Sequence, residues 1–254
     1  MIDLHCHLLP GIDDGPRDLR MTLAIAQLQL DAGVRTVAAT PHVSWDLPTS
    51  AETIAHGVAE VRAELAARGL PLEVVPGAEV DVHRAEQLGD EQLRALALGG
   101  GPWLLLEAPL QRGIPLEPVV HALLERGHRI LLAHPERAPG LQRDPDALRR
   151  LTDAGVVTQI TAGSLTGRFG RTVERYATVL AEEGLVHTIA SDAHDAVRRP
   201  PGMREVLRVA GLAPLGPLLT EEVPAAILAG EEIPPVPARP RARRRGLRAL
   251  LGRG

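Results

Sequence analysis

Nine residues whose side chains commonly bind metal ions stand at or near the ends of short apolar runs. Histidine nitrogens and carboxylate oxygens are ligands that manganese, iron and zinc accept in proteins. Nearly every run in the chain ends in such a residue, and one more lies in the loop GIDDG. The candidate metal ligands are His5, His7, Asp14, His42, Glu79, Glu107, His134, Asp192 and His194.

His5 and His7 lie two residues apart in an extended run, so both imidazoles are expected on one side and Cys6 on the other. If the runs are parallel strands of a βα barrel, their carboxyl ends face one mouth, where the other candidates would join this pair. Nine donors exceed the roughly four to six ligands of a single ion. We therefore expect two or three divalent ions that share at least one bridging carboxylate.

Taken singly, each candidate has an ordinary interpretation as a hydrogen-bonded structural residue. Four carboxylates beside five imidazoles in an apolar mouth are difficult to explain without cations. Three divalent ions would outweigh the four carboxylates and one bridging hydroxide, which leaves a positive site suited to a phosphate ester. In-line attack by that hydroxide would need no covalent phosphoenzyme.

Arg137 and Arg199 follow strand-end candidates, in the motifs HPER and RRPP, and are the candidate catalytic residues. Guanidinium groups at these positions could clamp phosphoryl oxygens in the transition state. Ordinary surface salt bridging is the alternative, because this chain contains no lysine and arginine carries all of its basic charge.

The elements that must position these residues alternate between strand and helix. Apolar runs without polar alternation are typical of parallel strands buried on both faces. Helices are expected from Asp18 to Gly33, from a capping box of Thr49 and Glu52 to Gly69, and from Asp144 to Gly155. Seven such units favour an α/β fold of the closed or nearly closed barrel type, with an open doubly wound sheet as the alternative. The seven expected strands are MIDLH, VRTVAAT, LEVVPGAEV, WLLLEA, HRILLAH, VVTQIT and VHTIASD.

Composition excludes several other classes of protein. The chain has 254 residues, 44% of them hydrophobic, and a single cysteine, so it can bury a core but cannot form an internal disulfide. Cys6 is followed by Ile12 where a cysteine-dependent phosphatase needs arginine, and the absence of lysine excludes a P-loop. The GSLTG segment around Ser164 does not match the nucleophile elbow of serine hydrolases. With neither a membrane span nor a secretory signal, the protein is expected to be cytoplasmic.

Charge divides the chain into an acidic body and a basic tail. Residues 239–254 carry seven arginines and no acid, while residues 1–238 hold 21 arginines against 32 acids, a net charge of −11. An acidic body argues against nucleic-acid binding. We expect residues 1–233 to form the barrel and residues 234–254 to be a disordered tail. Weak contact of this tail with an acidic membrane surface or partner is the alternative, through a stripe of Leu247, Leu250 and Leu251.

The remaining histidines are expected to have structural roles. His56, His83, His121 and His128 occur in helical or turn contexts and are predicted to be surface or capping residues. His187 opens the last strand at the end opposite the candidate ligands.

In its motifs and their order, residues 1 to about 230 of the chain resemble the polymerase and histidinol phosphatase (PHP) superfamily. Within that superfamily they are most similar to manganese-dependent bacterial protein-tyrosine phosphatases encoded with capsule and exopolysaccharide genes. The resemblance implies a distorted (β/α)7 barrel with three metal ions, manganese being the expected metal and iron or zinc the alternatives. The motifs are HCH, DDG, TPH, GAEV, LLEAP, AHPER, QITAGS, SDAH and RPP.

The same resemblance implies a ligand set for each ion. His5, His7, Glu79 and Asp192 would bind the first, Glu79, Glu107 and His134 the second, and Asp14, His42 and His194 the third, while Arg137 and Arg199 would contact phosphate. Two departures bear on the substrate: VSWDLPTS after His42 lacks the basic residues of some members, and Thr161 replaces an asparagine.

The implied substrate is a phosphotyrosine protein, such as a tyrosine kinase of polysaccharide synthesis. A small-molecule phosphatase, for example one acting on histidinol phosphate, and a non-catalytic metal-stabilised binding module are the alternatives.

Overall fold

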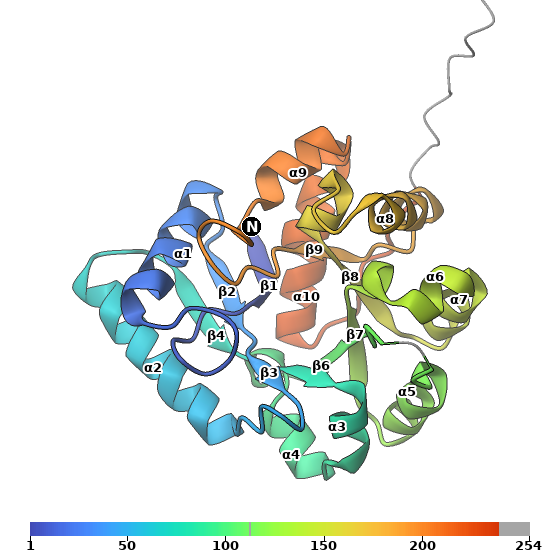
Figure 1. The fold of residues 1–254 in the computed structure, drawn as a ribbon, viewed down its shortest axis with the longest axis horizontal. Helices are drawn as coiled ribbons and strands as arrows, with labels where there is room; N and C mark the ends of the chain where they lie inside the picture. The colour runs from blue at the N-terminus through green and yellow to red at the C-terminus, as the bar shows by residue number, and fades with distance from the viewer. Residues whose placement is uncertain (112, 239–254) are drawn as a thin grey trace, which may run out of the picture.

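A ring of short parallel strands surrounded by helices forms the body of the protein in the computed structural model, which describes residues 1–111 and 113–238 (Figure 1). The order of the strand segments along the chain follows the expected alternation with helices. They are β1 (Ile2–Cys6), β2 (Thr36–Ala39), β3 (His42–Val43), β4 (Glu73–Pro76), β5 (Glu79–Asp81), β6 (Trp103–Glu107), β7 (Arg129–Ala133), β8 (Val157–Thr161) and β9 (Thr188–Ala190).

Two of the seven expected strands are interrupted, so the ring is divided into two sheets. The first sheet has the order β1-β2-β4 and the second the order β3-β5-β6-β7-β8-β9. Pro41 separates β2 from β3, where it can donate no ladder hydrogen bond. Gly77 separates β4 from β5, at a point where an added Cβ would lie 2.8 Å from Cδ2 of Leu98. Each interruption lets the strand bend and continue toward the mouth of the barrel.

The ring closes between the last strand and the first. The backbone N–H of Asp192 donates to the carbonyl of His5 (2.8 Å), and that of His7 donates to the carbonyl of Ala193 (2.9 Å). A parallel bridge also pairs Cys6 with Ala193. The expected distorted seven-unit barrel is therefore confirmed, and the open-sheet alternative is wrong.

Helices pack around the outside of the ring, and one packs across its amino end. Those on the outside cover the strands with apolar side chains. The α-helices are α1 (Leu19–Asp31), α2 (Ala51–Ala67), α3 (Val82–Gln87), α4 (Asp90–Ala95), α5 (Leu116–Glu125), α6 (Pro139–Arg143), α7 (Pro145–Asp153), α8 (Arg171–Glu183), α9 (Met203–Val209) and α10 (Val223–Ala229).

Capping residues set the starts of the three helices expected from sequence. Asp18 caps α1 by accepting from the N–H of Met21, and Asp144 caps α7 by accepting from the N–H of Ala147. The capping box expected at Thr49 is wrong: Ser50 caps α2 and accepts from the N–H of Thr53 (3.1 Å). Both hydroxyl residues can cap a helix, so sequence alone placed this start one residue too early.

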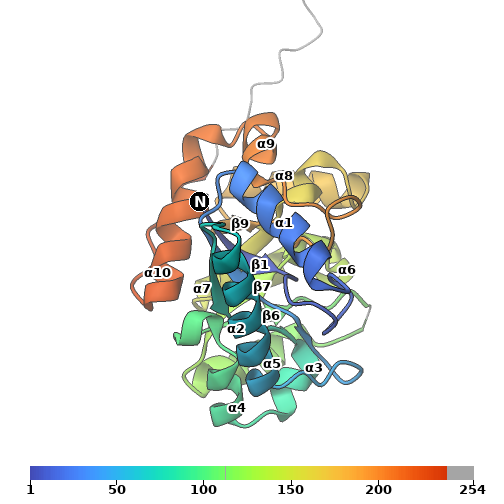
Figure 2. The same ribbon diagram turned by 90° about the vertical axis from the view of Figure 1, so that its left-hand side faces the viewer.

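The amino end of the barrel is filled with apolar side chains. Leu4, Leu105 and Leu131 belong to one buried cluster, together with Val223 and Ile227. The last two belong to α10, in the C-terminal part of the described chain. Figure 2 shows α10 on the side of the strands opposite the loop between β1 and α1. This end is therefore closed, and only the carboxyl end can admit a ligand.

The boundary expected at residue 234 falls in a segment that touches the body. Residues 234–238 form neither helix nor strand, and Val236 packs against both apolar clusters. The remainder of the expected tail, 239–254, lies outside the described residues. Among those that are described, no helix combines the length and the apolar character needed to cross a bilayer.

Candidate metal centre

The nine candidate ligands come together at the carboxyl end of the barrel. Their ligand atoms form four overlapping groups, in each of which all of the atoms lie within 4.8 Å of one another. The groups are His7, Asp14, His42 and His194; His5, Glu79 and His134; His5, His7 and Asp192; and His42, Glu79 and Glu107.

His5 and His7 face the mouth because of an irregularity in β1. Asp3 pairs with Val37 but Cys6 pairs with Ala39, so β1 contains one extra residue in this interval. Such a bulge re-aims side chains, and here Leu4 lies in the barrel interior while the next residue, His5, points into the mouth. Cys6 lies in the outer core, as expected, where burial raises the pKa of its thiol.

The Nδ1 atoms of both imidazoles are held by acceptors. Nδ1 of His5 donates to Oε1 of Gln159 (2.9 Å), and Nδ1 of His7 donates to Oδ2 of Asp13 (2.7 Å). In a neutral imidazole with a proton on Nδ1, the Nε2 atom carries a lone pair. Both Nε2 atoms are therefore oriented as metal ligands, an arrangement that outer hydrogen bonds impose in many metal sites.

These two lone pairs point at each other and at two carboxylates. The Nε2 atoms lie 3.3 Å apart. Oε2 of Glu79 is 3.2 Å from one and 3.3 Å from the other, and Oδ1 of Asp192 is 3.6 Å from each. Four acceptor atoms in a buried space repel one another unless a cation or protons lie between them. The donor set therefore fits a divalent ion.

The raised pKa values of two residues at the mouth also indicate that this space favours positive charge. Burial alone would lower the pKa of His7, but hydrogen bonds to Asp13 and Glu79 outweigh it and raise this pKa to about 10. Burial, followed by the charge of Glu79, raises the pKa of Glu107 to about 8. The pocket therefore holds protons where no cation is bound, and a metal ion would displace them.

Glu79 occupies the centre of the group and is almost fully buried. Its Oε1 is 2.7 Å from Nε2 of His134, and its Oε2 is 3.1 Å from Nδ1 of His42. His42 stands directly opposite Glu79 in the ladder between β3 and β5. The interruptions after β2 and β4 thus place both residues at the mouth, and Glu79 can bridge two ions.

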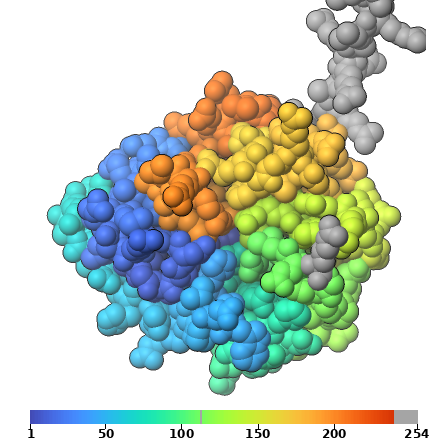
Figure 3. Space-filling view, in the orientation of Figure 1, coloured from blue at the N-terminus to red at the C-terminus, as the bar shows by residue number. Residues whose placement is uncertain are grey.

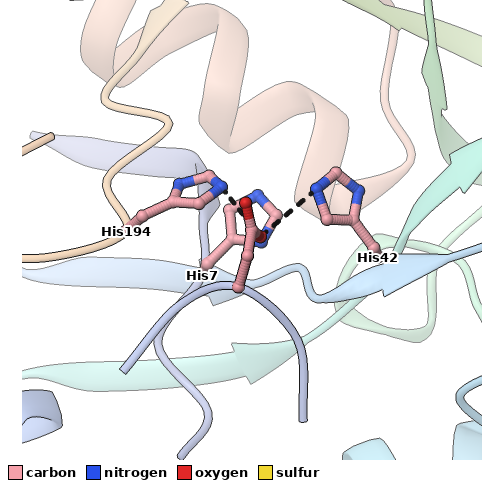
Figure 4. A group of neighbouring side chains, drawn as sticks. His7, His42 and His194 are labelled. Carbon is pink, nitrogen blue, oxygen red and sulfur yellow. Dashed lines mark ion pairs between the residues drawn. The ribbon is translucent and has the colours of Figure 1, made fainter. Parts of the chain in front are cut away.

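A third group lies nearer to solvent. Oδ1 of Asp14, in the loop after β1, lies 3.3 Å from Nε2 of His194 and 3.5 Å from Nε2 of His42. Figure 4 shows the three imidazoles of His7, His42 and His194 around this carboxylate. The hydrogen bond to His194 holds the pKa of Asp14 well below its usual range.

Two candidate ligands have strained backbones. His134 has φ of 34° and Asp192 has φ of 50°, and they are the only non-glycine residues with positive φ among those described. Each follows the end of a strand, where this conformation turns the side chain into the mouth. Strain of this kind costs about 1–3 kcal/mol and is commonly found at functional sites.

Asp192 connects the metal-binding side of the mouth to the two candidate arginines. Its Oδ1 faces His5 and His7, whereas its Oδ2 accepts from Arg137 (2.8 Å) and Arg199 (2.7 Å). The guanidinium of Arg137 also stacks on the ring of Phe169, 4.5 Å from its centroid. Both arginines are partly buried, and their partner belongs to the site, so the surface salt-bridge alternative does not describe them.

Three neighbours of the site were missed from sequence. Asp13 and Gln159 orient the two imidazoles of β1, and the doublet DDG and the motif QITAGS were the signals that could have suggested them. Glu136 is buried beside Arg137, and its Oε1 accepts from the N–H of Thr161 (3.0 Å) and the hydroxyl of Ser164 (2.6 Å). These two hydrogen bonds to Glu136 stabilise the turn that follows β8.

The other histidines lie away from this centre. His187 is at the amino end of β9, where its Nδ1 accepts from the N–H of Thr158 (3.2 Å), as its structural prediction requires. The surface prediction for His128 is wrong, because this residue is buried and its Nε2 lies 3.0 Å from Oδ1 of Asp90. His56 and His121 are exposed, and His83 is half-buried.

Comparison with known proteins gives a consistent match. The sequence profile described as "Capsular polysaccharide synthesis, CpsB/CapC" matches residues 1–211. The tyrosine-protein phosphatase YwqE of Bacillus subtilis is 32% identical over 212 residues, which cover 82% of this chain and 83% of YwqE. The tyrosine-protein phosphatase CpsB of Streptococcus pneumoniae is 28% identical over 214 residues, or 81% of this chain and 87% of CpsB.

Solved structures agree with the fold. A crystal structure from work on YwqE of B. subtilis and CpsB of S. pneumoniae, described as unique metal-dependent tyrosine phosphatases, has a TM-score of 0.82 and 29% identity. The match covers 96% of this chain and all of that one. A β-aspartyl dipeptidase from Fervidobacterium islandicum AW-1 matches with a TM-score of 0.57 at 14% identity, which shows a shared barrel fold alone.

Proposed function

The chain belongs to the CpsB/CapC family of capsular polysaccharide synthesis, and from that premise we propose that it is a metal-dependent protein-tyrosine phosphatase. The names of the relatives indicate this activity, and one observation in the structure supports it most strongly. Two imidazole nitrogens and two carboxylate oxygens, all acceptors, converge on one buried point at the barrel mouth. Such a set needs positive charge between its atoms, and a divalent ion supplies it.

The proposed ligands of each ion are those that the resemblance to the PHP superfamily implies, and the structure supports them by bringing the same nine residues together at the mouth. His5, His7, Glu79 and Asp192 would bind a first ion, Glu79, Glu107 and His134 a second, and Asp14, His42 and His194 a third. Bound there, divalent ions would polarise the phosphoryl oxygens and lower the pKa of an attacking water. Manganese is the proposed metal, and two or three ions are proposed per chain.

Arg137 and Arg199 are the side chains proposed to bind the phosphoryl oxygens. Oδ2 of Asp192 accepts from both, so the two guanidinium groups are fixed side by side and facing the candidate metal ligands. Donors with this spacing can each bind one oxygen of a phosphoryl group as its charge develops. Phe169 restricts Arg137 further, through the stacking described above.

The thiol of Cys6 takes no part in this reaction. It is fully buried in the outer core and faces away from the imidazoles, so it cannot reach a phosphoryl group. The reaction is accordingly proposed to proceed by attack of water, without a phosphocysteine intermediate.

The substrate is proposed to be a phosphotyrosine protein, with a bacterial tyrosine kinase of capsule or exopolysaccharide synthesis as the physiological candidate. The proposal also includes a cytoplasmic location. The names of the relatives support the substrate class, and the family description supports its link to capsule synthesis.

Chelation followed by re-addition of single metals tests this function. The purified protein should hydrolyse p-nitrophenyl phosphate and a phosphotyrosine peptide, lose both activities after chelation, and recover them best with Mn²⁺. Histidinol phosphate, the substrate of the small-molecule alternative, should be turned over much more slowly than the peptide. Activity that survives complete metal removal, or a preference for histidinol phosphate, would contradict the proposal.

A further inference from the structure

Three exposed apolar side chains stand around the candidate active site. Among the described residues, the exposed large hydrophobic ones are Trp45, Leu110, Val179, Val197 and Val209. Trp45, Leu110 and Val197 occur in loops that follow β3, β6 and β9 at the carboxyl end of the barrel, and we refer to these three as the apolar rim. Val179 and Val209 lie on the outer helices α8 and α9.

Trp45 lies in a hydrogen-bonded hairpin that begins at a candidate ligand. Val43 pairs with Pro48 in an antiparallel bridge, and the N–H of Ser44 donates to the carbonyl of Leu47 (3.0 Å). The indole is 60% exposed although the chain has only two tryptophans. Since His42 is only three residues away, this ring stands at the edge of the mouth.

Val197 has a similar position beside a candidate phosphate-binding arginine. It is 85% exposed, and it lies two residues before Arg199. Oδ1 of Asp195 accepts from the N–H of Val197 (2.6 Å), which fixes a turn in this loop. The turn lets Val197 face solvent while the guanidinium of Arg199 reaches Asp192 inside the mouth.

Leu110 completes the rim next to an apolar hollow. It is 40% exposed, and the adjacent Pro109 lines a cavity of about 250 Å³ together with Ile114 and Leu141. Ala138, which directly follows Arg137, also lines this cavity. The hollow therefore lies between the loop that carries Leu110 and the segment that follows Arg137.

Four arginines lie beside the apolar rim or in neighbouring loops at the same end of the barrel. The guanidinium of Arg84 stacks on Trp45 at 5.1 Å from the ring centroid, and the exposed Arg198 directly follows Val197. Arg17 and Arg168 are exposed in the loops after β1 and β8. Asp46 is the exposed acid beside Trp45. Figure 3 looks onto this face, where the dark blue loop after β1 and the orange loop after β9 lie side by side.

We propose that the apolar rim binds the polypeptide on either side of the phosphotyrosine, and that it favours segments with apolar and acidic residues. This inference rests on the proposed phosphatase function and specifies its substrate. A small phosphate ester that reaches the metals would leave these side chains in water. A protein segment that presents phosphotyrosine to the mouth would cover them, and tryptophan and arginine are the residue types that contribute most at such contacts.

Two peptides that differ only beside the phosphotyrosine test the rim. One carries leucine and glutamate at the flanking positions, the other serine and glycine, and p-nitrophenyl phosphate serves as the substrate without flanks. The wild-type protein should show kcat/KM about tenfold higher for the first peptide, mainly through a lower KM.

Trp45→Ala and Val197→Ser should each reduce that preference several-fold while leaving hydrolysis of p-nitrophenyl phosphate within about twofold. Trp45→Phe, which keeps a flat apolar ring, should retain most of the preference. Val179→Ser and Val209→Ser are matched controls on the outer helices, and they should retain all of it.

Equal kcat/KM for the two peptides in the wild-type protein, or rim variants that behave as the outer-helix controls do, would overturn the rim proposal while p-nitrophenyl phosphate is still hydrolysed. A protein that hydrolyses none of the three substrates with any metal would instead overturn the proposed function.

Discussion

At its amino end the barrel is filled by apolar side chains and covered by α10, whereas at its carboxyl end the same strands present imidazoles and carboxylates. β6 shows both environments within five residues, since Leu105 lies in the apolar cluster and Glu107 in the candidate metal centre. The backbone ladder is continuous across this change. Stability and chemistry are thus separated along each strand.

This separation explains how so many charges can be kept at the mouth. Buried carboxylates destabilise a fold unless cations or hydrogen bonds compensate them. The apolar end contains the packing that offsets strained and repelling groups at the other end, among them the left-handed His134 and Asp192. Substitutions at the two ends should therefore affect different measurements.

Glu79→Gln should have the largest effect. The carboxylate is shared by two of the four ligand groups, so its neutralisation should lower kcat/KM by at least about a thousandfold while the fold persists. Glu73→Gln is the matched control, since Glu73 is an exposed residue at the amino end of the same interrupted strand. Steady-state kinetics and circular dichroism would check both. Comparable losses in the two variants would contradict the division between the ends.

Ile227→Ala should show the opposite behaviour. Removing this fully buried side chain should lower the free energy of unfolding by about 2–5 kcal/mol through lost burial and a residual cavity. At temperatures where the variant is folded, kcat should remain close to the wild-type value, because Ile227 belongs to α10, at the amino end of the barrel. Urea denaturation and kinetics at low temperature would measure the two quantities. A folded variant with strongly reduced kcat would show that the amino end also determines the reaction rate.

Asp13→Asn should have an intermediate effect confined to the mouth. The amide can still accept a hydrogen bond from Nδ1 of His7, but it no longer supplies the charge that makes this imidazole a strong ligand. Metal affinity should fall about 10- to 100-fold. Asp18→Asn, in the same loop, is the matched control because asparagine also caps helices well. Metal titration of both variants tests this, and equal affinities would exclude the orienting role of Asp13.

His187→Gln should have the smallest effect, on the acid stability of the amino end. Burial lowers the pKa of His187 to about 4, so the fold favours its neutral form. Its contribution is present above the unfolded pKa of roughly 6.5 and is lost as the pH falls toward 4, by at most about 1.4 kcal/mol per pH unit. Thermal unfolding between pH 4 and 7 should therefore be less pH-dependent in the variant. An unchanged pH dependence would contradict this assignment.

Much of the fold could be predicted because the pattern is local. Apolar runs, the caps at Asp18 and Asp144 and the glycines after the helices each act within a few residues. The interruption of two strands was not predicted, since it depends on contacts distant in the chain, such as Leu98 against Gly77. The buried environment of His128 likewise depends on Asp90, which belongs to another element.

The residues of the candidate site could also be predicted from local sequence patterns, but the contacts between them could not. Strand-end positions identify which side chains reach the mouth, and the structure brings all nine together. Sequence could not show that Asp13 orients His7, because it does not show which carboxylate of the DDG doublet turns inward. Nor could it show that Asp192 faces the imidazoles with one oxygen and both arginines with the other.

The number of divalent ions bound per chain, measured together with the phosphatase rate, tests whether the nine residues at the mouth form a catalytic metal centre. Metal-free protein would be titrated with Mn²⁺ while bound metal and phosphate release from a phosphotyrosine peptide are followed in the same samples. We predict no activity without metal and a rate that saturates when two or three ions are bound per chain. Full activity in metal-free protein, or saturation of the rate with no ion bound at the mouth, would contradict this prediction.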